Sequence, residues 1–217
     1  QHDVTCGLEV HQQLDTGKLF SRCPTTMRED QPDFTFNRKI HAVASELGKI
    51  DPAAAEAARK KQTFVYQGFH ENTSLVEEDE EPPHPLDEDG LDVALEVSLL
   101  GNATIVDQAI VMRKTVVDGS NTSGFQRTIH LSFGGHITLY DGTKIGLLGL
   151  AVEEDSARPV ERKDHEVIYR LDRLGFPLIE LSTQPDIHSP EQAKQTAIKL
   201  GEIMRITGKV KRGLGTI

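Results

Sequence analysis

The sequence predicts an α+β fold in which a largely antiparallel sheet carries a few packed helices. Short β-branched and apolar segments separated by Gly-containing turns fill most of the stretch from Ala103 to Ile179. Helical signals are confined to three other segments, and neither an internal repeat nor a long linker divides the 217 residues. We therefore expect one domain spanning residues 1–217.

The first elements follow from local composition. The apolar segment of residues 4–10 predicts a strand. Asp51 is a suitable N-cap for a helix with Pro52 at its first position, and this helix should run to about Gln62. The β-branched and aromatic residues 63–69 then predict a second strand.

Two further helices have clearer boundaries. The segment 87–100 has leucines every four residues and is closed by Gly101 and Asn102. The last helix begins at Ser189 with Pro190 at its first position, and Gln192 completes a capping box. The apolar stripe of this last helix, which ends at Gly208, comprises Ala193, Ala197, Leu200 and Met204.

Between these helices the pattern predicts an antiparallel meander. Residues 105–106 and 110–112 are expected to share one strand. Gly134-Gly135 is expected to form a hairpin turn between strands 128–133 and 136–140, and Asp141-Gly142 to form the next turn.

Composition limits the function classes. The chain has 24 Lys and Arg against 34 Asp and Glu, so an RNA partner would need a local basic patch, another domain or bridging metal ions. Its two cysteines, Cys6 and Cys23, cannot build a four-thiolate zinc site and are expected to be reduced. No apolar stretch approaches the roughly 20 residues that a membrane span needs, so we expect a soluble, cytoplasmic chain.

Two groups of side chains are candidates for binding a metal ion. Glu9 and His11 lie two apart on a predicted strand and so share a face, although a solvated surface pair is the more common case. Glu153, Glu154 and Asp155 follow an apolar strand, where three adjacent acids repel one another unless a cation such as Mg²⁺ lies among them. The acidic run at 77–81 is flanked by prolines and polar residues, which favours a solvated turn.

Two polar segments have open interpretations. The loop after Arg113 and Lys114 is rich in Gly, Ser, Asn and Thr, and it suits either a phosphate- or sugar-binding loop or an ordinary mobile loop. Asp172 and Arg173 precede an apolar strand, where they form either a structural ion pair or part of a site. The histidines at 41, 70, 130, 136 and 165 show no ligand spacing and are interpreted as ordinary residues.

Taken together, these segments resemble the GatB/GatE family of amidotransferases, archaeal GatE above all, which acts on glutamyl-tRNA(Gln). The resemblance covers nearly the whole chain in the same order. The motifs that carry it are Gly7-Leu8-Glu9-Val10-His11-Gln12-Gln13-Leu14, Lys18-Leu19-Phe20, Asp118-Gly119-Ser120-Asn121-Thr122-Ser123-Gly124-Phe125-Gln126-Arg127, Glu153-Glu154-Asp155, Arg170-Leu171-Asp172-Arg173-Leu174-Gly175 and Pro177-Leu178-Ile179-Glu180.

The resemblance implies a cradle-shaped sheet and a two-step reaction. Such an enzyme uses ATP and Mg²⁺ to phosphorylate the γ-carboxylate of Glu mischarged on tRNA(Gln). Ammonia then displaces the phosphate, and it arrives through a channel from an asparaginase-like partner, the D subunit. A carboxylate is a poor electrophile, so the acyl phosphate supplies a leaving group, while metal-bound carboxylates neutralise charge at the phosphoryl group.

The resemblance also implies roles for individual residues. Glu9, His11 and Glu154 would bind metal, and Glu153, Glu154 and Lys114 would be catalytic. The remaining matches would contact substrate or nucleotide, and they are Ser120, Asn121, Thr122, Ser123, Gln126, Asp172 and Arg173.

Departures from the family pattern set further expectations. Cys23 stands alone where bacterial relatives often have a cysteine zinc site, so no zinc is expected. Family members continue beyond position 217 with further nucleotide-site residues and tRNA-gripping domains, so the chain is expected to be a truncated catalytic part, inactive alone. Two alternatives remain open: a non-catalytic module that docks the ammonia-supplying partner, and another ATP-dependent carboxylate-amine ligase acting on a free amino acid.

Overall fold

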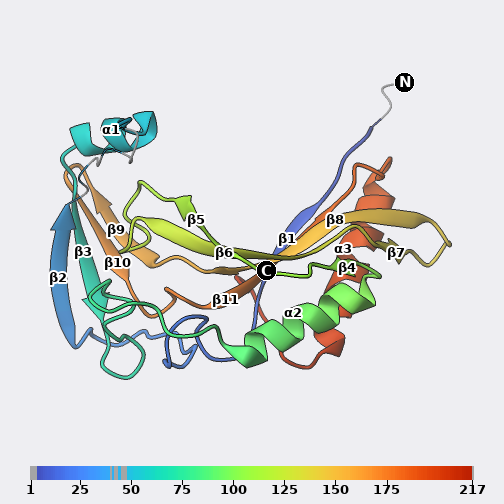
Figure 1. Ribbon diagram of the computed structural model, residues 1–217, viewed down its shortest axis with the longest axis horizontal. Coiled ribbons are helices and arrows are strands. Elements are labelled where there is room, and N and C mark those ends of the chain that lie inside the picture. The colour runs from blue at the N-terminus through green and yellow to red at the C-terminus, as the bar shows by residue number, and fades with distance from the viewer. Residues whose placement is uncertain (1–3, 40, 42–43, 45–47, 217) are drawn as a thin grey trace.

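The computed structural model describes residues 4–39, 41, 44 and 48–216. Two sheets and three helices make up this part of the chain (Figure 1), as the predicted α+β class requires. Its helices are α1 (Pro52–Arg59), α2 (Glu88–Leu100) and α3 (Pro190–Ile206). Its strands are β1 (Glu9–Gln13), β2 (Phe34–Lys39), β3 (Thr63–Gly68), β4 (Thr104–Ile105), β5 (Val111–Thr115), β6 (Phe125–Phe133), β7 (His136–Thr138), β8 (Lys144–Glu154), β9 (Arg158–Lys163), β10 (Glu166–Arg170) and β11 (Pro177–Thr183).

The larger sheet has seven strands and positions the candidate site. Its main order is β1-β11-β8-β6-β4, with β5 also paired to β6 and β7 to β8, and every pairing is antiparallel. In Figure 1 it curves like a shallow bowl, which agrees with the expected cradle. The smaller sheet has the order β2-β3-β10-β9 and includes one parallel pair, β3 with β10.

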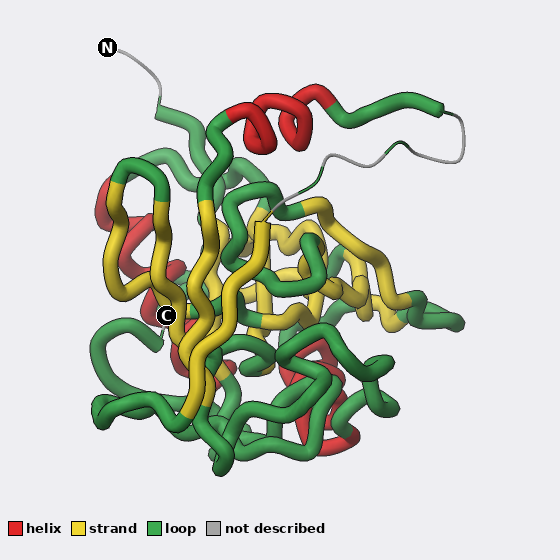
Figure 2. Tube along the Cα trace, turned by 90° about the vertical axis from the view of Figure 1, so that its left-hand side faces the viewer, coloured by secondary structure: helices red, strands yellow, loops and turns green. Residues whose placement is uncertain are grey.

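Helices α2 and α3 cover one face of the larger sheet and leave the other face open. Val97 of α2 and Leu200 of α3 belong to the same core cluster as Leu150 and Val152 of β8 and Ile179 of β11. Figure 1 shows α2 beneath the bowl, while the concave face above it has no helix lying directly on it. Helix α1 lies apart from both, as the red helix at the top of Figure 2.

The predicted helix caps are confirmed. The carboxylate of Asp51 accepts a hydrogen bond from the Ala54 amide, and the hydroxyl of Ser189 accepts one from the Gln192 amide. The Gln192 side chain in turn accepts from the His188 amide, which fixes the chain just before α3. The buried face of α2 is formed by residues 90, 93, 94, 97 and 98, while Leu99 is 65% exposed. A spacing of four drifts around a helix of 3.6 residues per turn, so the leucines do not define its buried face.

Two strand predictions are wrong. Gly134-Gly135 does not turn a hairpin, because β6 and β7 follow one another along the same side of β8. The Gly134 amide donates to Leu148 and the Leu147 amide donates to Gly135, so the ladder continues across this bend. Residues 105–106 and 110–112 also do not share one strand, since β4 and β5 pair separately with β6. The hairpin at Asp141-Gly142 is confirmed by the Leu139–Thr143 hydrogen bond.

Among the described residues, no helix is long and apolar enough to cross a membrane.

Candidate active site

The open face of the larger sheet carries a group of acids and one histidine. Antiparallel pairing sets His11 of β1 directly opposite Glu180 of β11, and Glu9 lies two residues earlier on the same face. One ligand atom from each of Glu9, His11 and Glu180 lies within 4.8 Å of the other two. The predicted pairing of Glu9 with His11 on one face is therefore confirmed as geometry.

Glu153 of β8 completes this group. Its Oε1 lies 3.4 Å from His11 Nε2, which is also 3.4 Å from Glu180 Oε2. Lys114 Nζ of β5 donates to Glu153 Oε2 at 2.5 Å, and the Thr128 hydroxyl donates to the same oxygen at 3.1 Å. Glu153 is only 2% exposed. A buried carboxylate held by an ammonium and a hydroxyl is fixed in position, as a reacting site requires.

An open cavity of about 560 Å³ is lined by Glu9, His11, Lys114, Glu153 and Glu180. Further along its wall, Gln13 Nε2 donates to Asp155 Oδ2 at 2.9 Å, and Arg173 Nε lies 3.5 Å from the same oxygen. Burial raises the pKa of Asp155, and the Arg173 guanidinium partly opposes that shift. Gln126 also lines the cavity, and its amide donates to the Glu154 carbonyl. The cavity is wide enough for part of a nucleotide or an aminoacyl group.

Glu154 lies on the opposite face of the sheet. Successive residues of a strand point to opposite sides, so Glu154 faces the helix-covered side while Glu153 faces the open cavity. Its carboxylate accepts from Arg127 Nη1 at 3.0 and 3.1 Å and from the Arg127 amide at 3.3 Å. Burial raises the pKa of Glu154, and Arg127 partly opposes this. The expected grouping of Glu154 with Glu9 and His11 is thus corrected, and Glu180 takes the third place.

One predicted loop lies beside Glu154 and not at the open cavity. It comprises Ser120, Asn121, Thr122 and Ser123. Asn121, Thr122 and Ser123 line a small cavity of about 10 Å³ next to Glu154, Arg127 and Glu77. The Thr122 hydroxyl donates to the Glu77 carbonyl at 2.6 Å. The Glu77 side chain is buried and accepts from the Ser21 hydroxyl and the Ser74 amide, so the solvated turn expected at 77–81 is wrong for this residue.

Asp172 and Arg173 do not pair with each other through their side chains. Asp172 is fully buried, and its carboxylate accepts from Arg158 Nη2 at 2.8 Å and from the Arg28 amide at 2.9 Å. Arg173 donates instead to the Ser156 carbonyl and lies beside Asp155 at the open cavity. Asp172 therefore holds the turn together, while Arg173 borders the candidate site.

Glu180 and Gln13 were missed by sequence reasoning. Both lie in the quoted motifs, yet neither belongs to an acidic run, and only strand register shows that they face Glu9, His11 and Glu153. The register pairs Leu178 of β11 with Glu153 of β8. Residues two apart on a strand share a face, so Glu180 lies on the same face of the sheet as Glu153.

The donor set of Glu9, His11 and Glu180 fits a divalent cation. Two carboxylates suit Mg²⁺, which is commonly bound by one or two carboxylates together with substrate phosphates. An imidazole is a less common ligand for Mg²⁺ and widens the choice to Mn²⁺ or Zn²⁺. The open cavity beside the three residues leaves room for phosphate oxygens and water, which Mg²⁺ retains.

Comparison with known proteins gives a consistent result. Residues 4–217 match the family described as the GatB/GatE catalytic domain. A protein of Methanocaldococcus jannaschii, named as the E subunit of glutamyl-tRNA(Gln) amidotransferase, is 55% identical over 212 residues, which are 97% of this chain and 34% of that protein. Proteins of the same name from Halobacterium salinarum and Pyrobaculum neutrophilum are 53% and 49% identical, over 99% and 97% of this chain and 34% and 35% of their own.

This chain spans about a third of the length of these curated relatives. The family match, in contrast, covers almost all of the chain and includes every residue of the open-face group. The chain therefore belongs to the family of GatB/GatE catalytic domains.

Proposed function

We propose that this chain is the catalytic domain of a tRNA-dependent amidotransferase that converts Glu-tRNA(Gln) to Gln-tRNA(Gln). The supporting observation is the convergence of Glu9, His11, Glu180, Glu153 and Lys114 from four strands onto one open face. The relatives that match nearly the whole chain carry this activity in their names.

In this proposal, ATP phosphorylates the γ-carboxylate of the tRNA-linked glutamate on the open face. Glu9, His11 and Glu180 would hold Mg²⁺, and when bound the ion would neutralise charge that gathers at the transferring phosphoryl group. The Lys114 ammonium, fixed 2.5 Å from Glu153, lies where it can donate to a phosphate or carboxylate oxygen. Arg173 and Gln126 border the same cavity and are assigned to substrate orientation.

The second step replaces phosphate by ammonia. We propose that a separate asparaginase-like protein, the D subunit, supplies this ammonia within a heteromeric complex. Glu153 can hold the proton that ammonia loses on attack, because its carboxylate is the buried acceptor nearest to Lys114 and His11. The loop of Ser120 to Ser123, together with Glu154 and Asp172, would shape the walls behind this face.

A full-length complex tests the proposal directly. Glu180→Gln and Glu9→Gln should each abolish formation of Gln-tRNA(Gln) from Glu-tRNA(Gln), ATP and Mg²⁺, with ammonium chloride in place of the partner's ammonia. The matched control is Glu161→Gln, an exposed carboxylate on β9, the edge strand of the smaller sheet. Assembly with the partner should be unchanged in all three variants. Full activity of Glu180→Gln would contradict the site, and a wild-type complex that needs no tRNA would contradict the substrate.

A further inference from the structure

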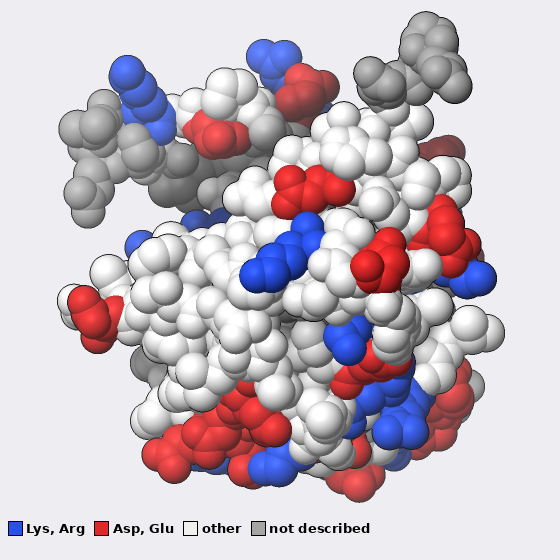
Figure 3. Space-filling model, turned by 90° about the vertical axis from the view of Figure 1, so that its right-hand side faces the viewer, with Lys and Arg blue, Asp and Glu red and all other residues white. Residues whose placement is uncertain are grey.

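One segment of this acidic chain is basic. Residues 38–61 contain six Lys and Arg against three Asp and Glu, whereas the whole chain has 34 acidic and 24 basic residues. The segment includes the end of β2 and all of α1. Figure 3 shows the largest group of acidic side chains at the lower edge of that view, with further acidic and basic side chains over the rest of this face.

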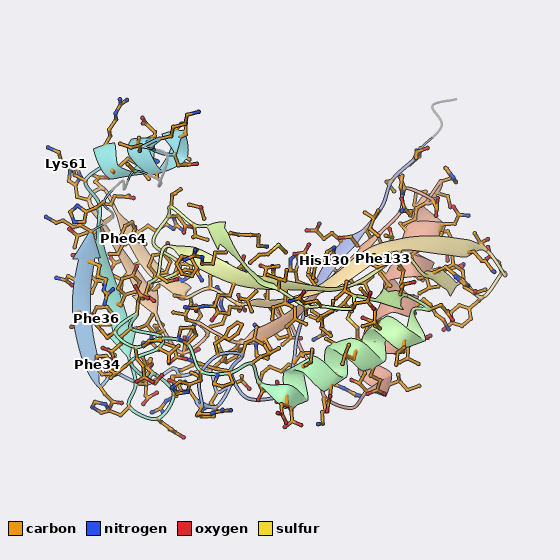
Figure 4. The ribbon with its side chains drawn as sticks, in the orientation of Figure 1. Phe34, Phe36, Lys61, Phe64, His130 and Phe133 are labelled. Atoms are coloured by element: carbon orange, nitrogen blue, oxygen red, sulfur yellow. The ribbon has the colours of Figure 1, made fainter. Side chains whose placement is uncertain are left out.

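The lysines of this segment are exposed to solvent. Lys39, Lys49 and Lys61 are exposed, and within the described residues none of them forms an ion pair, whereas the neighbouring Arg38 and Arg59 do. Helix α1 itself buries none of its residues. Figure 4 shows Lys61 at the end of α1, above Phe64 of the smaller sheet. Exposed cations that pair with no acid in the described part of the chain are available to an anionic ligand.

These lysines line two adjoining depressions that share His41, and the second depression reaches the end of β5. Lys39, His41 and Lys61 line a cavity of about 310 Å³. His41 also lines the next one, of about 810 Å³, together with Lys49 and Thr115. Thr115 is the last residue of β5, the strand that also carries Lys114 to the open face. Figure 1 shows α1 on the same side of the larger sheet as its concave face.

We propose that this row, from Lys61 through Lys39 to Lys49, binds the phosphate backbone of the RNA whose aminoacylated end reaches the open face. The inference rests on the proposed function and adds the surface that positions its substrate. A row of separated cations matches a polymer that carries one phosphate per nucleotide, while a small anion would need only one of the cavities. Each phosphate contact releases condensed counterions, so binding along the row depends steeply on salt.

The test measures binding of Glu-tRNA(Gln) to the full-length complex as a function of salt. The double variant Lys49→Ala/Lys61→Ala removes two exposed cations from the row. The matched control Lys144→Ala/Lys194→Ala removes two cations on β8 and α3, away from it. We expect the first variant to weaken binding roughly tenfold or more at about 0.1 M salt and to lower the slope of log K against log salt by about two. The control should leave both quantities unchanged.

The outcomes separate this inference from the proposed function. Equal affinity and equal slope in the two double variants would overturn the RNA surface, even if the wild-type complex forms Gln-tRNA(Gln). A wild-type complex without amidotransferase activity would instead overturn the proposed function. Weaker binding of the row variant to anionic phospholipid vesicles with unchanged tRNA binding would assign the row to a membrane surface and also reject the inference.

Discussion

Arg127 is the only cation that contacts the buried Glu154 carboxylate among the described residues, through its side chain and its own amide. Its guanidinium also lies 5.4 Å from the centre of the Phe125 ring and 5.6 Å from that of Phe20. Burial raises the pKa of Glu154 and Arg127 opposes that shift, so the pair is a balance between desolvation and charge. Such a pair contributes little net stability, yet its separation is costly.

We predict that Arg127→Met destabilises the fold by about 3 kcal/mol at neutral pH, because it leaves a buried carboxylate unpaired. The loss should shrink as pH falls. Without Arg127, the pKa of Glu154 rises further in the folded state but not in the unfolded state. The folded state then binds a proton at a higher pH than the unfolded state does. The free energy of unfolding therefore decreases as pH rises from the unfolded-state pKa to the folded-state pKa. Urea unfolding at about pH 5 and about pH 7.5 measures this difference.

The control for this prediction is Arg113→Met, which also removes a guanidinium lying over the Phe125 ring, at 5.2 Å from its centre. Arg113 is exposed, so its loss should cost well under about 1 kcal/mol at either pH. A pH-independent loss in Arg127→Met would show that packing, and not the charge of Glu154, sets the cost.

Lys18 is a second residue whose environment the sequence did not reveal. Its side chain is fully buried, and Nζ donates to the carbonyls of Asn72 and Leu171 and lies 3.6 Å from Glu77 Oε1. Desolvation lowers its pKa, and Glu77 opposes this shift. The three partners lie 54 to 153 positions away along the chain, so no local pattern could have indicated the burial.

At the scale of elements, the bend at Gly134-Gly135 decides how the larger sheet is connected. Gly135 has a positive φ of 89°, and a Cβ there would lie 2.3 Å from the Gly101 carbonyl oxygen. Gly142 has a similar φ of 86°, but a Cβ there would meet nothing within 4 Å. The two glycines therefore share backbone strain and differ in steric contact.

We predict that Gly135→Ala costs at least about 2 kcal/mol more than Gly142→Ala. Both variants lose roughly 1 kcal/mol for alanine at positive φ. Only the first must also displace the backbone of Gly101 and Ala103, in the loop between α2 and β4. Thermal unfolding of the two variants against wild type gives the comparison. Equal losses would mean that the loop between α2 and β4 moves freely, which would reject the tight bend.

The elements that the sequence predicted best are those fixed by local chemistry. Asp51 and Ser189 cap their helices because a side-chain oxygen meets an amide three residues on, which depends only on nearby residues. The Gly134-Gly135 hairpin was wrong because a Gly pair permits either a turn or a bend, and pairing with the distant strand β8 decides between them. Strand pairing is a tertiary choice that local composition does not contain.

At the scale of the whole molecule, the larger sheet separates side chains that adjoin in sequence. Glu153 and Glu154 follow each other, yet one faces the open cavity and the other the loop of residues 120–123. The sequence identified the acidic run, while the third member of the metal group, Glu180, comes from a later strand and depends on the β1-β11-β8 register. The sequence could indicate the acidic run because it is a local feature of composition. It could not indicate which acids converge, because that depends on the pairing of distant strands.

This separation gives a prediction that compares the two faces. Glu180→Gln should lower the affinity for Mn²⁺, used as a probe for Mg²⁺, at least about tenfold, because it removes one of three converging ligand atoms. Glu154→Gln should leave that affinity within about twofold, since its carboxylate is bonded to Arg127 behind the sheet. Calorimetric titration of each full-length variant with Mn²⁺ gives the measurement, with unfolding temperature as the check that both remain folded. If Glu154→Gln loses as much affinity as Glu180→Gln, the ion is held through the sheet rather than on its open face, and the metal group assigned to Glu9, His11 and Glu180 is wrong.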